Sequence, residues 1–453
     1  MRKIFIILSL NFFAFSSKAQ SWNELLKYSD PSSNEMSFYG RAVAISDNYA
    51  AVGAYAEEED EQGNNPLMEA GAVYIYKRTS SLWSPVQKLV GFDRTAGDYF
   101  GYAVSMNNTT LAIGAQYNDN DADGNFKNNN IGAVYIYELD SNDEWVFSQK
   151  IVASDGEVGD IFGTAVFLHG NYLFVSSIYD DHTTPVSISN AGSVYVFEKI
   201  NGVWTEIQKI IPSDLRANDQ FGTSIAADGN FLVIGGSAIG TDLNNQDVLP
   251  SAGASFIFEN QGGTWVQIQK IIAQDREAGA FFGGSVSIKG DFILIGASGE
   301  KKDEIGANPI DGAGAAYLFK NDGSGNWSQH QKLVSNARAE FNQFGKKVQL
   351  DSTVGISSNS FRNPVDTTST DENIGSIFLI KKNTSNNWNI VDEIIPSDSH
   401  DEQNFGTALN FLDNQLIVGT NKREIYIYDY LCNIATGIDN ITSCSPITWI
   451  DGI

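Results

Sequence analysis

The sequence predicts an all-β protein, a seven-bladed β-propeller whose blades each contain four antiparallel strands. The prediction rests on a recurring glycine, a recurring tryptophan and the strand-like patterns between them. The glycines follow Phe, or Tyr in the first repeat, at intervals of 61, 62, 59, 61, 62 and 61 residues: Gly40, Gly101, Gly163, Gly222, Gly283, Gly345 and Gly406. A tryptophan lies 18 residues before each of them: Trp22, Trp83, Trp145, Trp204, Trp265, Trp327 and Trp388. Long repeats of this kind indicate solenoids, propellers or arrays, because one unit cannot bury its apolar face alone.

The second repeat illustrates the strands expected in one unit. Residues 100–106 alternate in the manner of a strand, and a turn at 107–109 separates them from a second apolar segment at 111–115. After a polar loop, two further segments rich in β-branched and aromatic residues follow at 132–137 and 145–151. Four short antiparallel strands per repeat are typical of a propeller blade. No repeat shows a sustained apolar period of 3.6 residues, which disfavours a helical solenoid.

The two ends of the repeat array complement each other. The seventh repeat has its first three strand segments but no tryptophan strand after them. The matching segment lies at the start of the chain, because residues 22–27 (WNELLK) correspond position by position to residues 204–209 (WTEIQK). We therefore expect the N-terminal segment to form the fourth strand of the last blade and to close the ring. Closure also covers a blade edge whose unpaired backbone groups would promote aggregation.

The composition disfavours several classes of partner. The 453 residues include 29 Lys and Arg against 55 Asp and Glu, which gives a formal net charge of −26. Such a surface repels nucleic acid phosphates and anionic lipid, so we expect no nucleic acid partner. It is suited to divalent cations. The 42 glycines and 12% aromatic residues are typical of a β protein with many tight turns.

The chain ends are expected to lie outside the propeller. Residues 1–19 have the features of a secretory signal peptide, with a basic start, a short apolar run and a small-residue cleavage site. The apolar run is too short for a permanent transmembrane helix, so we predict an exported chain with no transmembrane segment. The propeller is expected at 20–430, and residues 431–453 look like the start of a truncated β module. Cys432 and Cys444 lie in this tail, either as a disulfide or as free or otherwise paired thiols.

Three sets of recurring residues are expected to have structural roles. The glycines of the Phe-Gly pairs are predicted to mark a bulge or a close approach between backbones near the crowded axis. The tryptophans are predicted to be packing anchors between neighbouring blades. Eight residues before the glycine, five repeats have an aspartate for which we expect an Asx turn in preference to metal binding: Asp93, Asp155, Asp214, Asp275 and Asp398. Ser32 and Ala337 occupy this position in the other two repeats.

The motifs FGxxV, LxIGA, GAVYIY and WxxxQK resemble the FG-GAP repeat family, which includes the integrin α-subunit propeller and many secreted bacterial proteins. Residues 153–163 (ASDGEVGDIFG) are especially similar to the bacterial members. The resemblance implies a seven-bladed propeller that serves extracellular recognition or acts as a structural module, and it does not imply an enzyme. Integrin-like members have a calcium loop between the Phe-Gly strand and the next strand. Here that interval spans 13 residues in every repeat and holds only a short turn, so the family's calcium ligands are not carried over.

Length variation is concentrated in the connection between the second and third strands. Between the glycine positions of these strands it spans 18, 18, 16, 18, 18 and 17 residues in the first six repeats and 4 in the last. Alternate connections of an up-and-down blade emerge on one face, so we expect six long loops at one rim, where binding usually occurs. The loops are acidic, as in Glu57–Glu61.

One of these loops resembles the first half of an EF-hand calcium loop. Asp119, Asp121 and Asp123 alternate along it and are followed by Gly124. Ca²⁺ prefers several such oxygens, and glycine allows the sharp turn around the ion. The twelfth position, however, is Asn130 instead of a bidentate Glu. Two interpretations therefore remain open, a Ca²⁺ site and a solvated acidic loop.

These observations favour a secreted or cell-surface binding or adhesion module over an enzyme. The four histidines fall at unrelated repeat positions, and the repeats contain neither a GxSxG motif nor a cysteine. We expect a monomeric propeller that recognises an extracellular protein or glycan through the long loops of one rim. The alternative is a structural spacer of a larger surface protein, with no ligand of its own.

Overall fold

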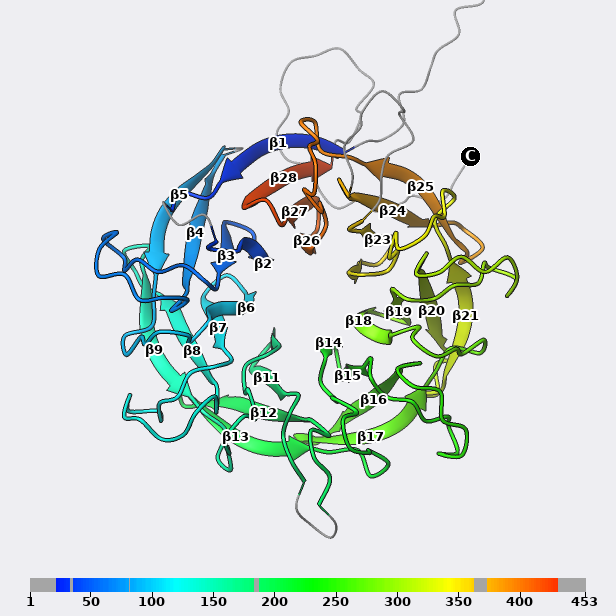
Figure 1. Cartoon of the computed structure of the whole chain (residues 1–453), viewed down its shortest axis with the longest axis horizontal. Helices are drawn as coiled ribbons and strands as arrows, with labels where there is room; N and C mark the ends of the chain where they lie inside the picture. Colours follow the sequence, from blue (N-terminus) through cyan, green and yellow to red (C-terminus); the bar gives the residue numbers. More distant parts are fainter. Residues whose placement is uncertain (1–21, 33–35, 81, 183–186, 362–372, 431–453) are drawn as a thin grey trace, which may run out of the picture.

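The computed structural model describes residues 22–32, 36–80, 82–182, 187–361 and 373–430. Within these ranges the chain forms 28 β-strands in seven four-stranded antiparallel sheets, and it contains no helix. The sheets are arranged as blades around a central axis (Figure 1), which confirms the predicted propeller. The signal peptide expected at 1–19 and the tail at 431–453, with Cys432 and Cys444, lie outside the described residues.

Each blade places its first strand nearest the axis and its fourth strand at the outer edge (Figure 1). Blades 1 and 2 contain β2 (Tyr39–Ile45), β3 (Tyr49–Ala54), β4 (Ala72–Thr79) and β5 (Leu82–Leu89), then β6 (Phe100–Met106), β7 (Thr110–Ala115), β8 (Ala133–Leu139) and β9 (Trp145–Ile151). Blades 3 and 4 contain β10 (Val166–His169), β11 (Tyr172–Ser177), β12 (Ser193–Ile200) and β13 (Val203–Ile210), then β14 (Ser224–Asp228), β15 (Phe231–Gly236), β16 (Ala254–Gln261) and β17 (Thr264–Ile271).

The remaining blades follow the same order. Blades 5 and 6 contain β18 (Phe282–Lys289), β19 (Phe292–Ala297), β20 (Ala315–Asn321) and β21 (Trp327–Leu333), then β22 (Val348–Leu350), β23 (Val354–Asn359), β24 (Ser376–Lys382) and β25 (Trp388–Ile394). Blade 7 contains β26 (Ala408–Leu412), β27 (Gln415–Gly419), β28 (Glu424–Tyr430) and, as its outer strand, β1 (Trp22–Ser29).

The N-terminal strand closes the ring. β1 pairs antiparallel with β28, in a register that places Trp22 opposite Tyr430 and Ser29 opposite Glu424. The beginning and the end of the propeller thus share one sheet (Figure 1), as the sequence predicted. Because this sheet contains strands from both ends of the repeat array, backbone hydrogen bonds hold the ring closed.

The Phe-Gly glycines lie where neighbouring backbones meet. Gly101 has a φ of 91°, and a Cβ at this position would lie 2.6 Å from the carbonyl oxygen of Ala72 in the preceding blade. The pairing between β6 and β7 shifts register between Phe100 and Ala103. The prediction of a bulge with a close backbone approach is therefore confirmed, since a side chain at this position would collide with main-chain atoms.

The tryptophans pack between blades, as predicted. Trp145 is 1% exposed and contacts Tyr49 of blade 1 edge to face, with ring centroids 5.4 Å apart. Each described core cluster similarly combines residues of two adjacent blades, for example Val73 with Ile113. Apolar burial therefore occurs mainly at the interfaces between blades, and a blade without its neighbour would expose this surface.

A glutamine on each of five outer strands adds a polar contact to this interface. Gln87 accepts a hydrogen bond from the backbone N–H of Trp145 at 3.0 Å and donates one to its carbonyl oxygen at 2.9 Å. The same pairing joins Gln149 to Trp204, Gln208 to Trp265, Gln269 to Trp327 and Gln331 to Trp388. The residues at the glutamine position of the other two outer strands are Asp392 and Leu26. Where the pairing occurs, it fixes the outer strand of one blade against that of the next.

Candidate binding face

The long connections between the second and third strands of blades 1, 2, 4 and 5 gather on one face of the disc, together with the linkers between blades. In blade 1, for example, the backbone N–H of Gly97 in the linker donates to Met68 of the loop at 2.8 Å, and that of Tyr99 donates to Glu69 at 3.1 Å. We call this side the loop face. Each loop is held at its base by the linker that leads to the next blade, so the loops stand on a fixed scaffold.

Four of the loops contain the same turn, built around an aspartate. The carboxylate of Asp121 accepts hydrogen bonds from the backbone N–H of Asp123 at 3.0 Å and of Asn125 at 2.8 Å. The equivalent residues of the other three loops are Asp60, Asp242 and Asp303, with N–H donors two and four residues later. These backbone hydrogen bonds lower the pKa of all four carboxyl groups, because they stabilise the charged form.

The three aspartates proposed as calcium ligands have different local roles. Asp121 holds the turn, while Asp119 accepts a hydrogen bond from the backbone N–H of Asn130 at 2.7 Å. Asp123 contributes its backbone N–H to the turn, and its side chain is exposed. Among the residues that the structure describes, no group of three or more acidic, His or Cys side chains is arranged to hold a metal ion. Calcium binding at Asp119, Asp121 and Asp123 stays a prediction.

Beneath the loop face, the aspartates of the linkers form ion pairs with the next blade. Asp93 lies 2.6 Å from the ammonium of Lys150 on β9 and accepts a hydrogen bond from the hydroxyl of Tyr135 on β8 at 2.6 Å. Equivalent pairs join Asp155 to Lys209, Asp214 to Lys270, Asp275 to Lys332 and Asp398 to Lys27. The prediction of an Asx turn at these positions is wrong, because the carboxylates face a lysine and, in four of the blades, a tyrosine that the following blade provides.

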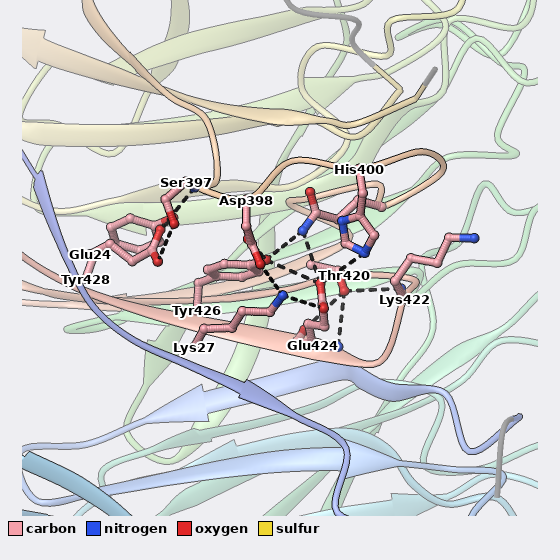
Figure 2. A network of polar contacts seen from close by, with 11 residues as sticks. Glu24, Lys27, Ser397, Asp398, His400, Thr420, Lys422, Glu424, Tyr426 and Tyr428 are labelled. Carbon is pink, nitrogen blue, oxygen red and sulfur yellow. Dashed lines mark hydrogen bonds and ion pairs between the residues drawn. The ribbon is translucent and has the colours of Figure 1, made fainter. Parts of the chain in front are cut away.

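Figure 2 shows this network in blade 7, where both ends of the propeller contribute. Lys27 of β1 contacts Asp398 and also lies 2.6 Å from Glu424, and the hydroxyl of Tyr426 donates to Asp398 at 2.6 Å. Burial alone would raise the pKa of Asp398, but the hydrogen bonds from Lys27 and Tyr426 outweigh it and lower the pKa. The network ties the N-terminal strand to the last blade, which gives these charges a structural role.

Blade 6 differs at every member of the network. Ala337, Phe378 and Glu393 stand where other blades have the aspartate, the tyrosine and the lysine. The joint replacement is consistent with these three side chains forming one unit. Blade 6 also has the shortest inner strand, the three residues of β22.

Aromatic side chains gather at the loop-face end of the inner strands of blades 1 and 2. Tyr55 contacts three other rings, with centroid distances of 4.8 Å to Phe38, 4.9 Å to Tyr99 and 5.5 Å to Tyr102. The contact between Tyr99 and Tyr117, at 4.9 Å, extends the cluster. These residues form an aromatic cluster with hydroxyl groups at this end of the two blades.

Three cationic side chains lie just after the Phe-Gly glycines of blades 1 and 6. Arg41 and Lys346 directly follow the Phe-Gly glycines of blades 1 and 6, and Lys347 comes next in the chain. Arg41 donates to the side chain of Asn421, and none of the three forms an ion pair within the described part of the chain. Lys347 is exposed at the surface. The protein near its ammonium group, together with the like charges of Lys346 and Arg41, lowers the pKa of Lys347 to about 8.

A pocket of about 640 Å³ adjoins these lysines and lies between blades 4, 5 and 6. Lys346 and Lys347 line one side of it, and Phe281 and Phe341 line it from the linkers that precede blades 5 and 6. The two phenyl rings are 43% and 61% exposed. Its size and mixed lining are suited to a small ligand or to one unit of a larger one.

Sequence reasoning did not find this pocket. A signal for the cationic cluster was nevertheless present, because the residue after the Phe-Gly glycine is charged only in blades 1 and 6. In the other five blades it is Tyr102, Thr164, Thr223, Gly284 and Thr407. Aligning the seven repeats position by position would have singled out Arg41 and Lys346.

The protein is therefore a seven-bladed β-propeller with long loops on one face. The chain belongs to the FG-GAP repeat family, whose model, described as FG-GAP repeat, matches residues 22–76, 83–137, 145–197, 204–258 and 265–319. Each matched segment begins with the outer strand of one blade and ends within the third strand of the next, so the sequence repeat straddles two structural blades. A search among curated proteins finds no match to the chain. Within the described ranges, no helix has the length and apolar character needed to span a membrane.

Proposed function

We propose that the protein is a secreted or cell-surface binding or adhesion module without enzymatic activity, which contacts an extracellular protein or glycan through its loop face. The observation that carries the proposal is the concentration on this face of long second-to-third-strand connections, which the structure describes in full in blades 1, 2, 4 and 5. Long loops on a rigid scaffold are where proteins most often place binding residues. The signal peptide predicted at residues 1–19 supports an extracellular location, and the acidic charge disfavours nucleic acid.

The proposal is tested with the mature chain on a glycan array and in pull-down experiments from the native extracellular material. Once a ligand is found, the tips of the long loops are replaced one blade at a time by a glycine-serine linker, for example residues 119–129 in blade 2. We expect at least one replacement to weaken binding while the melting temperature changes little. The matched control is the same replacement in a hairpin of the opposite face, at Ser141-Asn142.

The alternative function is a structural spacer with no ligand. It would be favoured if neither the array nor the pull-down gave a specific ligand for folded protein. Binding that depends only on the opposite face would also contradict the proposal, because the elaborated loops would then have no part in recognition.

A further inference from the structure

Arg41, Lys346 and Lys347 form a small cationic cluster that is suited to binding an anion. The protein as a whole has a net charge of −26, yet Lys346, Lys347 and Arg41 lie together without an ion pair to a carboxylate in the described ranges. The like charges of Lys346 and Arg41 repel that of Lys347. An anion placed between Lys346 and Lys347 would relieve this repulsion and form charge-assisted hydrogen bonds.

Phe341, beside these lysines, has a backbone conformation that is unfavourable for a bulky residue. Phe341 has a φ of 57° and is 61% exposed. Its position, four residues before the Phe-Gly glycine, is glycine in blades 2, 3 and 5 (Gly97, Gly159 and Gly279, with φ of 87°, 86° and 76°) and a polar residue in blades 4 and 7 (Asn218 and Glu402, with φ of 66° and 54°). A bulky residue is disfavoured in this left-handed region, and an exposed ring contributes little to the core. Folding therefore does not explain the phenyl group, whereas a ligand that contacts the pocket would.

The rest of the pocket is lined by groups that bind hydroxyls. Thr223, Ser237, Ser298 and Gln343 supply side-chain donors and acceptors. Several lining residues are glycines, which leave main-chain N–H and C=O groups accessible. Together with two exposed phenyl rings, this lining matches a sugar, whose hydroxyls form hydrogen bonds and whose C–H faces pack on aromatic rings.

The acidic residues around the pocket favour a ligand whose negative charge is confined to one group. Lys301 at the rim is already paired with Asp311 at 3.0 Å, and the neighbouring loops carry a large excess of carboxylates. A long polyanion would be repelled by these carboxylates, because charges that approach within the Debye length of about 8 Å at physiological salt are only weakly screened. A ligand with one carboxylate on an otherwise neutral body avoids this repulsion.

We propose that the pocket between blades 4, 5 and 6 binds the end of an oligosaccharide that carries a single carboxylate. Lys346 and Lys347 contact the carboxylate, while Phe281 and Phe341 contact the sugar ring. This inference rests on the proposed function and specifies its ligand class and its site on the loop face.

The test is calorimetric titration of the full mature chain with sialyllactose and with a disaccharide that ends in glucuronic acid, each compared with its neutral counterpart. We expect at least one acidic probe to bind. Its neutral counterpart should bind at least about tenfold more weakly, as expected for the loss of a charge-assisted hydrogen bond. Lys346→Gln and Lys347→Gln should each weaken the acidic probe by about tenfold. Lys320→Gln, which removes a lysine beside Phe292 at the far end of β20, is the matched control and should have no effect.

Phe341→Gly separates binding from folding. Glycine suits the left-handed conformation, so the melting temperature should stay the same or rise, while affinity for the acidic sugar falls. Equal binding of neutral and acidic probes, binding of sulfated lactose or of an acidic peptide in place of the carboxylated sugar, or unchanged affinity in both lysine variants would overturn the inference. If the protein binds neither acidic sugar, the inference is overturned. The proposed function would still stand if the array or the pull-down gave another ligand of the loop face.

Discussion

At the scale of single residues, the ionised form of Asp160 is unfavourable in the folded state. It is 3% exposed, and burial raises its pKa to about 6 from an ordinary value of 3.8, with a smaller contribution from the charge of Asp180. Between these two values the folded state binds a proton that the unfolded state does not bind. The free energy of unfolding therefore falls as pH rises through this window, by up to about 3 kcal/mol at about 1.4 kcal/mol per pKa unit.

We predict that Asp160→Asn stabilises the protein at neutral pH. The amide oxygen can still accept the hydrogen bond that the backbone N–H of Glu157 donates at 2.7 Å, and the buried charge is removed. The melting temperature of the variant should exceed that of the wild type at about pH 7.5, and the difference should shrink at about pH 4.5. Asp242→Asn is a control for which the opposite effect is expected. Hydrogen bonds lower the pKa of Asp242, so its carboxylate stabilises the folded state at neutral pH and this stabilisation is lost as pH falls. Equal destabilisation of Asp160→Asn at both pH values would contradict the prediction.

A second prediction concerns the glutamines between blades. Gln208 accepts a hydrogen bond from the N–H of Trp265 and donates one to its carbonyl, both at 2.8 Å. Gln208→Ala leaves both backbone groups without this partner and should lower the free energy of unfolding by about 1–3 kcal/mol. Urea denaturation measures the loss, and Gln62→Ala in an exposed loop should change it by less than about 0.5 kcal/mol. Similar effects for the two variants would show that the pairing does not stabilise the interface.

The repeat pattern predicted some of these residue roles but not others. The tryptophans and glycines were identified because one residue type recurs at one position and has one obvious physical use. Asp93 was misjudged because its partner Lys150 is 57 residues away and lies on another blade. That pairing can be inferred only with the blade order and the register of β9 already known. The simultaneous loss of all three members in blade 6 was the sequence signal that remained unused.

At the scale of strands and loops, the outer strand β1 is held to blade 7 by backbone pairing and by side-chain contacts. It pairs with β28 along its length, and its side chains Glu24 and Lys27 bond to the linker that enters blade 7. Deleting residues 22–28 should expose the edge of β28 and lower the melting temperature sharply. Adding a peptide of the deleted sequence should restore part of the loss, which a general effect of truncation would not allow.

A calcium titration decides the role of the acidic loop in blade 2. If Asp119, Asp121 and Asp123 bind Ca²⁺, adding the ion to EDTA-treated protein should raise the melting temperature and protect the loop from protease. Asp123→Ala should abolish this effect with little change in the metal-free protein, because the described turn uses only the backbone of Asp123. Unchanged melting and protease sensitivity after the addition of Ca²⁺ would support a solvated acidic loop.

The strands were easier to predict from sequence than the loops. Residues 100–106 and 145–151 were expected as strands and form β6 and β9 with these bounds, because β-branched and aromatic residues between turn segments are visible in the sequence. The carboxylates of the blade 2 loop left no such trace. Metal ligands and turn-forming aspartates have the same composition, and the difference lies in where backbone N–H groups point once the loop has closed.

At the scale of the whole molecule, the ring could be predicted because the two ends of the repeat array are complementary. The pocket between blades 4, 5 and 6 could not, since it combines residues that are scattered along the chain from Thr223 to Lys347. Its cations are also too few to affect a composition that is dominated by acidic residues. Predicting it would require both the blade order and the direction in which each linker residue points.

The ring geometry leads to a last prediction, about how the chain must be closed. Trp22 lies opposite Tyr430 in an antiparallel pair, so a short turn such as Asn201-Gly202 could join these ends into an ordinary hairpin. A permutant that starts at Val203 and ends at Ile200 would again share one blade between its two ends. A second permutant, opened between Ala96 and Gly97 in a linker, would have seven complete blades but no shared sheet. We expect the first to melt close to the wild type and the second to melt lower, because contacts between neighbouring blades, without a shared sheet, would oppose opening of its ring. Equal melting of the two permutants would show that contacts between blades suffice to keep the ring closed, and that the shared sheet adds no stability.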